Sequence, residues 1–197
     1  MTNEFLGTVD HLNEVKTPAP KIKGMHHMAY RCRDAAETKK FYVDLLGLKQ
    51  SAALAFDKDP SGGDRPYMHL FFEMGDGNFI AFFDAPATAS DDVFTMKDGI
   101  EDYHFAFEVE TKAEQDAFIQ RLKEAKVPVF GPIDHHFCHS IYFFDPNGLA
   151  CEITLKDAKH DAILADEASK AQAVMKQWSE KTRVLKEAKL SLFKAAD

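Results

Sequence analysis

The sequence predicts an α+β fold in which two βαβββ modules form one open, barrel-like mixed sheet, followed by a C-terminal helix. Three observations lead to this expectation. A strand–helix–strand pattern begins near residue 23 and starts again near residue 103. The two patterns align at one constant offset. Residues 157–197 then carry a helical pattern without strand signals.

The offset is the same over the first strand and the following helix. His27 lies 77 positions before His104. The same spacing joins Asp34 with Thr111, Glu37 with Glu114, Phe41 with Phe118 and Leu45 with Leu122. Such agreement indicates an internal duplication, and two copies are too few for a solenoid. We therefore expect the two sheets to share an interior, into which equivalent residues of the two first strands point.

The first module is predicted over residues 23–86. Residues 25–32 alternate as a strand does, and Asp34 followed by Glu37 is typical of a helix N-terminus. Gly47 then marks the end of that helix. Further strands are expected over residues 67–74 and 79–83, on either side of the turn Gly75-Asp76-Gly77-Asn78. Residues 1–22 end in Thr17-Pro18-Ala19-Pro20 and read as an extended arm.

The second module is predicted over residues 103–155, after an acidic connector. A strand over 103–109 precedes Thr111 and Glu114, which form a capping-box pattern. Two more strands are expected over residues 140–144 and 149–155, around the turn Asp145-Pro146-Asn147-Gly148.

Residues 156–197 are predicted to form an amphipathic helix outside the modules. Its apolar positions alternate at spacings of four and three: Leu164, Ala168, Ala171, Met175, Trp178, Thr182 and Leu185. Packing of this seam on the chain's own modules is the favoured interpretation. The alternative is a contact between two copies, that is, a homodimer.

Composition excludes several classes of function. The net charge of −8 argues against a nucleic-acid partner, which would need a basic face. No apolar run approaches the ~18 residues of a membrane-spanning helix, and the N-terminus lacks the features of a secretory signal. Three cysteines make no disulfide framework, so we expect a cytoplasmic protein. The 17 phenylalanines fit either an aromatic core or an apolar pocket.

The residues that could carry chemistry are two histidines and one glutamate. His27 and His104 occupy equivalent places in the two modules, so the duplication predicts that they converge. Glu152 lies within an apolar strand, where ionised carboxylates are rare without a partner or a metal. Two histidines and one carboxylate form the facial set of non-haem Fe(II) oxygenases, which leaves open positions for substrate and dioxygen. The alternative places Glu152 on an edge strand facing solvent.

The first module resembles that of the vicinal oxygen chelate superfamily, whose members pair βαβββ modules. The resemblance rests on Gly24-Met25-His26-His27-Met28-Ala29, Asp34, Phe41-Tyr42 and Leu46-Gly47-Leu48. It covers residues 23–155. It favours His27 over His26, because His27 lies seven residues before Asp34, as His104 does before Thr111.

The second module resembles the signature of type I extradiol ring-cleavage dioxygenases. The matching positions are Ile133-Asp134-His135, Ile141-Tyr142, Phe143-Phe144, Asp145-Pro146-Asn147-Gly148 and Glu152. The resemblance implies a dioxygenase that cleaves the ring of a small aromatic diol with O2, in the breakdown of aromatic compounds. It implies Fe(II) held by His27, His104 and Glu152, with Mn(II) the less favoured metal.

The same resemblance assigns roles around the metal. Tyr142 matches the tyrosine that bonds the substrate, and His135 matches the signature histidine, an acid–base candidate. His136 and His139 lie close enough in sequence to take that role instead. The family's further pocket histidine has no counterpart between His69 and His104, so His69 is the candidate from a neighbouring strand. Phe82 is expected in the apolar wall of the substrate pocket.

Two other functions stay open at this point. A metal-dependent lyase or isomerase of the glyoxalase and epimerase type is one, and a non-catalytic protein that binds an aromatic ligand is the other. Relatives of the first type usually carry Glu or Gln in the last strand of the first module. Here that stretch is Phe79-Ile80-Ala81-Phe82-Phe83, which favours oxygen chemistry.

Overall fold

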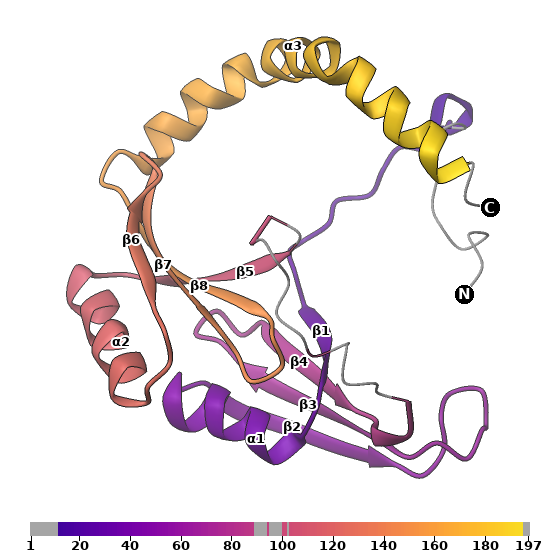
Figure 1. Ribbon diagram of the computed structural model, residues 1–197, viewed down its shortest axis with the longest axis vertical. Coiled ribbons are helices and arrows are strands. Elements are labelled where there is room, and N and C mark those ends of the chain that lie inside the picture. Colours follow the sequence, from indigo (N-terminus) through magenta and orange to yellow (C-terminus); the bar gives the residue numbers. More distant parts are fainter. Residues whose placement is uncertain (1–11, 89–93, 95–99, 102, 195–197) are drawn as a thin grey trace.

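The computed structural model describes residues 12–88, 94, 100–101 and 103–194 (Figure 1). The first module contains β1 (His27–Cys32), α1 (Ala35–Lys39) with its π-helical continuation η3 (Lys40–Leu45), β2 (Lys49–Phe56), β3 (Tyr67–Glu73) and β4 (Phe79–Asp84). The second contains β5 (His104–Val109), α2 (Lys112–Glu124), β6 (Phe130–Asp134), β7 (Cys138–Phe144) and β8 (Ala150–Lys156). Outside these modules lie the 3₁₀ turns η2 (Leu12–Glu14) and η4 (Pro86–Thr88) and the helix α3 (His160–Lys194).

The expected α+β fold of two βαβββ modules is confirmed. Each module forms a four-stranded mixed sheet, in the order β1-β4-β3-β2 and β5-β8-β7-β6. In both sheets the first strand pairs in parallel with the last, and the other pairs are antiparallel. Among the described strands the two sheets are not hydrogen-bonded to each other and no barrel closes, which fits the open arrangement that we expected.

The modules contact each other through a turn and a helix. The turn after β7 docks against the first module, where the Tyr42 hydroxyl donates to the buried Asp145 carboxylate at 3.0 Å. The Arg33 backbone N–H donates to Asn147 Oδ1 at 2.9 Å. In return, Arg121 of α2 donates to the carbonyl oxygens of Leu45 and Asp44. The Asp145–Gly148 turn therefore joins the two modules.

One face of each sheet is covered by that module's helix. On the first sheet, Tyr42 stacks on Phe72 with ring centroids 5.6 Å apart and packs against Phe82 at 4.8 Å. On the second sheet, the Gln115 side chain of α2 donates to the carbonyls of His139 and Ile153. The opposite face of each sheet is left for the candidate site.

Capping patterns give the helix starts correctly. Asp34 accepts a hydrogen bond from the Glu37 backbone N–H, and Thr111 forms a complete capping box with Glu114. Gly47 ends the first helix with a φ of 82°, a conformation that favours glycine.

The helix α3 departs from the favoured expectation. Figure 1 shows it as a long arc that leads away from both sheets. The seam residues Met175, Trp178 and Leu185 are 64%, 56% and 69% exposed, so the prediction that the chain's own modules cover them is wrong. No helix among the described residues is long and apolar enough to cross a membrane.

Candidate metal centre

Three predicted site residues share the helix-free face of the second sheet. Tyr142 of β7 pairs with Glu152 of β8, which pairs with Ala106 of β5. His104 lies two residues before Ala106, so its side chain points to the same face. The alternation of side chains along each strand thus brings His104, Tyr142 and Glu152 together on the side opposite α2.

His104 and Glu152 form the centre of this group. Nε2 of His104 lies 3.1 Å from Oε2 of Glu152, whose side chain is only 7% exposed. Nδ1 of His104 lies 2.8 Å from the carbonyl oxygen of Ile100. Because a carbonyl can only accept, Nδ1 carries a proton, and Nε2 is the ring nitrogen that faces the carboxylate.

This donor set fits a divalent cation. Two acceptors 3.1 Å apart need either a second proton on His104 or a cation between them. Two ligands that bind one ion at ~2.1 Å and at right angles are ~3.0 Å apart. A ligating histidine also typically donates its other ring N–H to a carbonyl or carboxylate, as His104 does to Ile100.

Tyr142 and His135 continue the group. Nε2 of His135 lies 2.8 Å from the Tyr142 hydroxyl, and the rings of Tyr142 and His104 are 6.2 Å apart. Burial, together with the negative charge of Glu152, raises the pKa of the Tyr142 phenol above its usual 10.0. Tyr142 therefore stays protonated at neutral pH and can donate a hydrogen bond.

His27 lies on the first sheet, among aromatic side chains. Its ring centroid is 5.5 Å from that of Phe71 and 6.3 Å from that of His69. Nδ1 of His27 is 2.8 Å from Nδ1 of His26. His69 pairs across the sheet with Phe83 and stacks on it at 3.8 Å. His69 therefore does lie on the His27 face.

The structure does not bring the three predicted ligands together in one chain. Among the described residues, no group of three His, Cys, Asp or Glu side chains gathers closely enough to hold a metal. His27 is exposed on a sheet that does not pair with the sheet of His104 and Glu152. The expected convergence of His27 and His104 is therefore absent within a single copy.

Three other predicted residues lie away from these faces. Phe82 is fully buried against Tyr42 on the helix side of β4. The β4 residues on the His27 face have odd numbers, from Phe79 to Phe83, so the side chain of Phe82 points to the opposite face. His139 points to the α2 side of β7, with Nε2 3.5 Å from an oxygen of Asp157. His136 is exposed in the turn after β6, with a φ of 71°. Phe71 and Phe83, and not Phe82, supply the aromatic wall beside His27.

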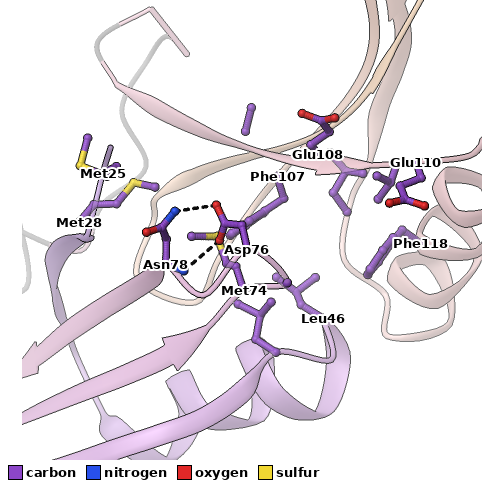
Figure 2. Close-up of a pocket in the computed structure, with 15 residues that line it drawn as sticks. Met25, Met28, Leu46, Met74, Asp76, Asn78, Phe107, Glu108, Glu110 and Phe118 are labelled. Carbon is purple, nitrogen blue, oxygen red and sulfur yellow. Dashed lines mark hydrogen bonds between the residues drawn. The ribbon is translucent and has the colours of Figure 1, made fainter. Parts of the chain in front are cut away.

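A cavity of about 710 Å³ between the modules contains none of the predicted site residues. Figure 2 shows Met28, Leu46, Phe107 and Phe118 in its apolar wall, with Asp76 and Asn78 joined by hydrogen bonds. The cavity lies between the helix-covered faces of the two modules, and we interpret it as a gap in their packing.

A cavity of about 420 Å³ on the first sheet holds residues that the sequence reasoning missed. Arg31 and Arg65 line it, together with His69. The period of β1 could have indicated Arg31, because it lies four residues after His27 and so shares its face.

Comparisons with known proteins agree with this architecture. The family model described as Glyoxalase/Bleomycin resistance protein/Dioxygenase superfamily matches residues 24–153. No curated protein matches the chain significantly.

Solved structures of related fold cover about the same part of the chain. A glyoxalase/dioxygenase from Nostoc punctiforme is 25% identical, with a TM-score of 0.55, covering 73% of this chain and 98% of that one. A glyoxylase/bleomycin resistance protein/dioxygenase domain from Frankia sp. EAN1pec is 20% identical, with a TM-score of 0.57, covering 70% and 100%. A mutant of the fosfomycin resistance protein FosX from Listeria monocytogenes, complexed with Mn(II) and 1S,2S-dihydroxypropylphosphonic acid, is 18% identical, with a TM-score of 0.53, covering 72% and 99%.

Proposed function

Because the chain belongs to the Glyoxalase/Bleomycin resistance protein/Dioxygenase superfamily, we propose that it is a metal-dependent extradiol dioxygenase that cleaves the ring of a catechol-like substrate. The observation that carries the proposal is the group of His104, Glu152, Tyr142 and His135 on one face of the second sheet. It combines a buried carboxylate, an imidazole nitrogen beside it, a protonated phenol and an acid–base candidate.

His104 and Glu152 would supply two of the metal ligands, and His27 the third. Fe(II) is the favoured ion and Mn(II) the less favoured one, since imidazole and carboxylate suit both. When bound, the ion would supply charge stabilisation and a template on which a diol and O2 meet. Three protein ligands leave positions open for both reactants.

A second copy of the chain would bring His27 to the other two ligands. His27 is exposed on its own sheet, and the His104 side chain is 38% exposed, so both halves are accessible to a partner. A homodimer with two such centres would pair His27 of one copy with His104 and Glu152 of the other. The exposed seam of α3 provides further apolar surface for this association.

Tyr142 and His135 would act on the substrate. The Tyr142 phenol, kept protonated by burial and by Glu152, would donate a hydrogen bond to a substrate oxygen beside the metal ligands. His135, 2.8 Å from that hydroxyl, would accept or return a proton during turnover.

The first sheet argues against the lyase or isomerase alternative. The β4 side chains on the His27 face are Phe79, Ala81 and Phe83, which cannot act as ligand or base. Glu73 of β3 lies on the same face, but it accepts hydrogen bonds from Lys49 and Ser51, and these lower its pKa and hence its strength as a base.

Anaerobic loading tests the proposal. The protein is loaded with Fe(II) without air, mixed with a panel of catechols and then exposed to oxygen. We expect oxygen uptake and a coloured ring-fission product with at least one catechol. Stoichiometric iron with no oxygen uptake across the panel would contradict the dioxygenase proposal, and binding of a catechol without any metal would favour a non-catalytic binding protein.

A further inference from the structure

The cavity of about 420 Å³ lies on the His27 face of the first sheet, at the opposite end of β1 from His27. Its volume is within the range of small-molecule sites. Its lining includes Arg31, Asp59, Arg65, Tyr67, His69 and Phe83. We infer that this cavity binds the carboxylate of an aromatic acid, with Arg31 as the cation that recognises it.

The charges of the cavity do not balance. Arg65 donates through Nε to Asp59, whose carboxylate also accepts from the backbone N–H groups of Ser61 and Gly63. Asp59 thus compensates Arg65. Arg31 instead donates through Nη2 to two neutral oxygens, the carbonyl of Ala85 at 2.8 Å and the hydroxyl of Thr88 at 2.9 Å.

Arg31 therefore lacks a counter-ion within the part of the chain that the structure describes. Its Nε is buried without a hydrogen-bond partner. A partly buried cation without an anion is costly, and a guanidinium binds a carboxylate with two parallel hydrogen bonds. An anionic group in the cavity would supply the missing charge.

His69 is the second polar group without a partner. Its Nε2 is buried and makes no hydrogen bond. The cavity therefore presents one uncompensated cation and one imidazole nitrogen without a partner, which suits a singly charged carboxylate.

Aromatic walls indicate the rest of the ligand. Phe83 stacks on His69 at 3.8 Å, and Tyr67 lies 6.0 Å from Phe83. The His69 ring is also 6.3 Å from that of His27, so the aromatic surface continues from the cavity to the proposed metal ligand.

Four residue steps along β1 separate the Cα atoms of His27 and Arg31 by roughly 13 Å. This separation leaves room for one aromatic ring over the sheet between them. Resting on the proposed function, the substrate would be a catechol that carries a carboxylate, bound at Arg31 while its hydroxyls lie toward His27.

Calorimetric titration of the metal-free full-length protein tests the cavity without the metal centre. Benzoate is compared with benzamide, which has the same shape and no charge, and with inorganic phosphate. We expect benzoate to bind roughly 10–100-fold more tightly than benzamide, the range of one charge-assisted bidentate contact. Equal affinities of benzoate and benzamide in the parent protein would overturn the inference. If phosphate bound as tightly as benzoate, the claim that the ligand is aromatic would be overturned.

Two variants locate the effect. Arg31→Gln keeps a donor for the Ala85 carbonyl and should lose the preference for benzoate. Lys58→Gln removes the same charge from a side chain that is 66% exposed and paired with Asp64, and it should keep the preference. Equal loss in both variants would mean a nonspecific charge effect and would also overturn the inference.

Oxygen uptake separates this inference from the proposed function. With Fe(II) bound, 2,3- and 3,4-dihydroxybenzoate should be consumed faster than catechol. Equal turnover of catechol and both acids would refute the substrate class while leaving the dioxygenase intact. A strong preference for benzoate over benzamide, with no oxygen uptake by any diol, would support the cavity and refute the dioxygenase.

Discussion

At the scale of single residues, the contact between His104 and Glu152 carries the argument for a metal. The Nδ1–H of His104 donates to the Ile100 carbonyl, and Nε2 of the same ring faces the Glu152 carboxylate at 3.1 Å. Removal of either side chain leaves at most two of the three proposed ligands.

His104→Ala and Glu152→Ala should each weaken Fe(II) binding by more than ~100-fold, because even outer-shell partners of a metal contribute 10–100-fold. Metal analysis after equilibrium dialysis measures the effect. His160→Ala is the matched control, since His160 lies at the start of α3 and its Nδ1 contacts the exposed Asp161 carboxylate. Undiminished stoichiometric iron in His104→Ala would refute the ligand set.

Loss of His135 should affect turnover and not metal content. His135→Ala should bind Fe(II) normally and slow turnover by ~10²–10⁴-fold if the imidazole transfers a proton. Tyr142→Phe removes one hydrogen bond to a charged group and should lower the rate of turnover roughly 10–100-fold. Iron titration and initial oxygen uptake measure the two effects separately, and loss of iron in step with activity would instead make His135 a ligand.

The cysteine thiols should be inert in the folded protein. Cys32, Cys138 and Cys151 are all buried and unpaired. Burial raises the pKa of the Cys32 thiol to about 11 and that of Cys151 well above 9.0. At pH 8 the thiolate fraction of Cys32 is then only ~10⁻³, so alkylation with iodoacetamide should be slow until the chain is unfolded.

The raised pKa of Cys32 also makes the folding stability depend on pH. The thiol ionises near 9.0 in the unfolded chain and near 11 in the folded protein. Burial of the neutral thiol therefore contributes to stability below pH 9, and this contribution is lost as the pH rises toward 11. Mass spectrometry of the native protein should show no modified Cys32 or Cys151 after an alkylation that labels the unfolded chain. Rapid native labelling of Cys32 would contradict its burial.

At the scale of elements, local signals predicted the strands that lie inside the sheets and the starts of both module helices. The expected strands over 67–74 and 79–83 are observed as β3 and β4, because both have neighbours on each side and a strong apolar pattern. β2 and β6 were missed. β1 and β5 are edge strands as well and were predicted, but nearly all residues of β2 and β6 are exposed, so their side chains carry no alternation.

A register break also hides β6. Gly131 has a φ of 107°, and a Cβ at this position would lie 2.7 Å from the Ser140 carbonyl oxygen. The strand therefore needs a glycine where a β-branched residue would normally signal a strand.

The helix α3 gives the prediction that belongs to this scale. Because the large apolar side chains Met175, Trp178 and Leu185 of its seam are exposed in one copy, and the proposed metal ligands are split between two sheets, we expect the seam to pack against a second copy. Trp178→Glu should shift the protein to a monomer, while Gln177→Glu, the same change of charge one residue away, should not.

Analytical ultracentrifugation over a range of concentrations measures the association, and the melting temperature of the parent should rise with concentration. A parent protein that is monomeric at all concentrations, with a melting temperature unchanged by Trp178→Glu, would show that the seam has no such partner.

At the scale of the whole molecule, the duplication was predictable and the arrangement of its copies was not. The 77-residue offset holds for β1 and β5, which begin at His27 and His104. What the offset could not predict is which surfaces the modules would use to meet. The contact is made by hydrogen bonds from Tyr42 to Asp145 and from Asn147 to Thr38. These bonds depend on the folded turn, so no local sequence pattern indicates them.

This arrangement also explains why the structure brings only part of the predicted site together within one copy. His104, Glu152, Tyr142 and His135 belong to one module, so the strand register alone brings them together. His27 belongs to the other, and its position depends on contacts between modules or between copies.

The most direct test of the central claim is complementation between two variants that each lack a ligand. His27→Ala and Glu152→Ala are produced with different tags, and the mixed dimer is isolated through both tags. If His27 of one copy completes the centre of the other, one of the two centres in the mixed dimer has all three ligands. We predict one bound Fe(II) per mixed dimer and almost none in either variant alone. A mixed dimer that binds no more iron than its parents would contradict a metal centre shared between two copies.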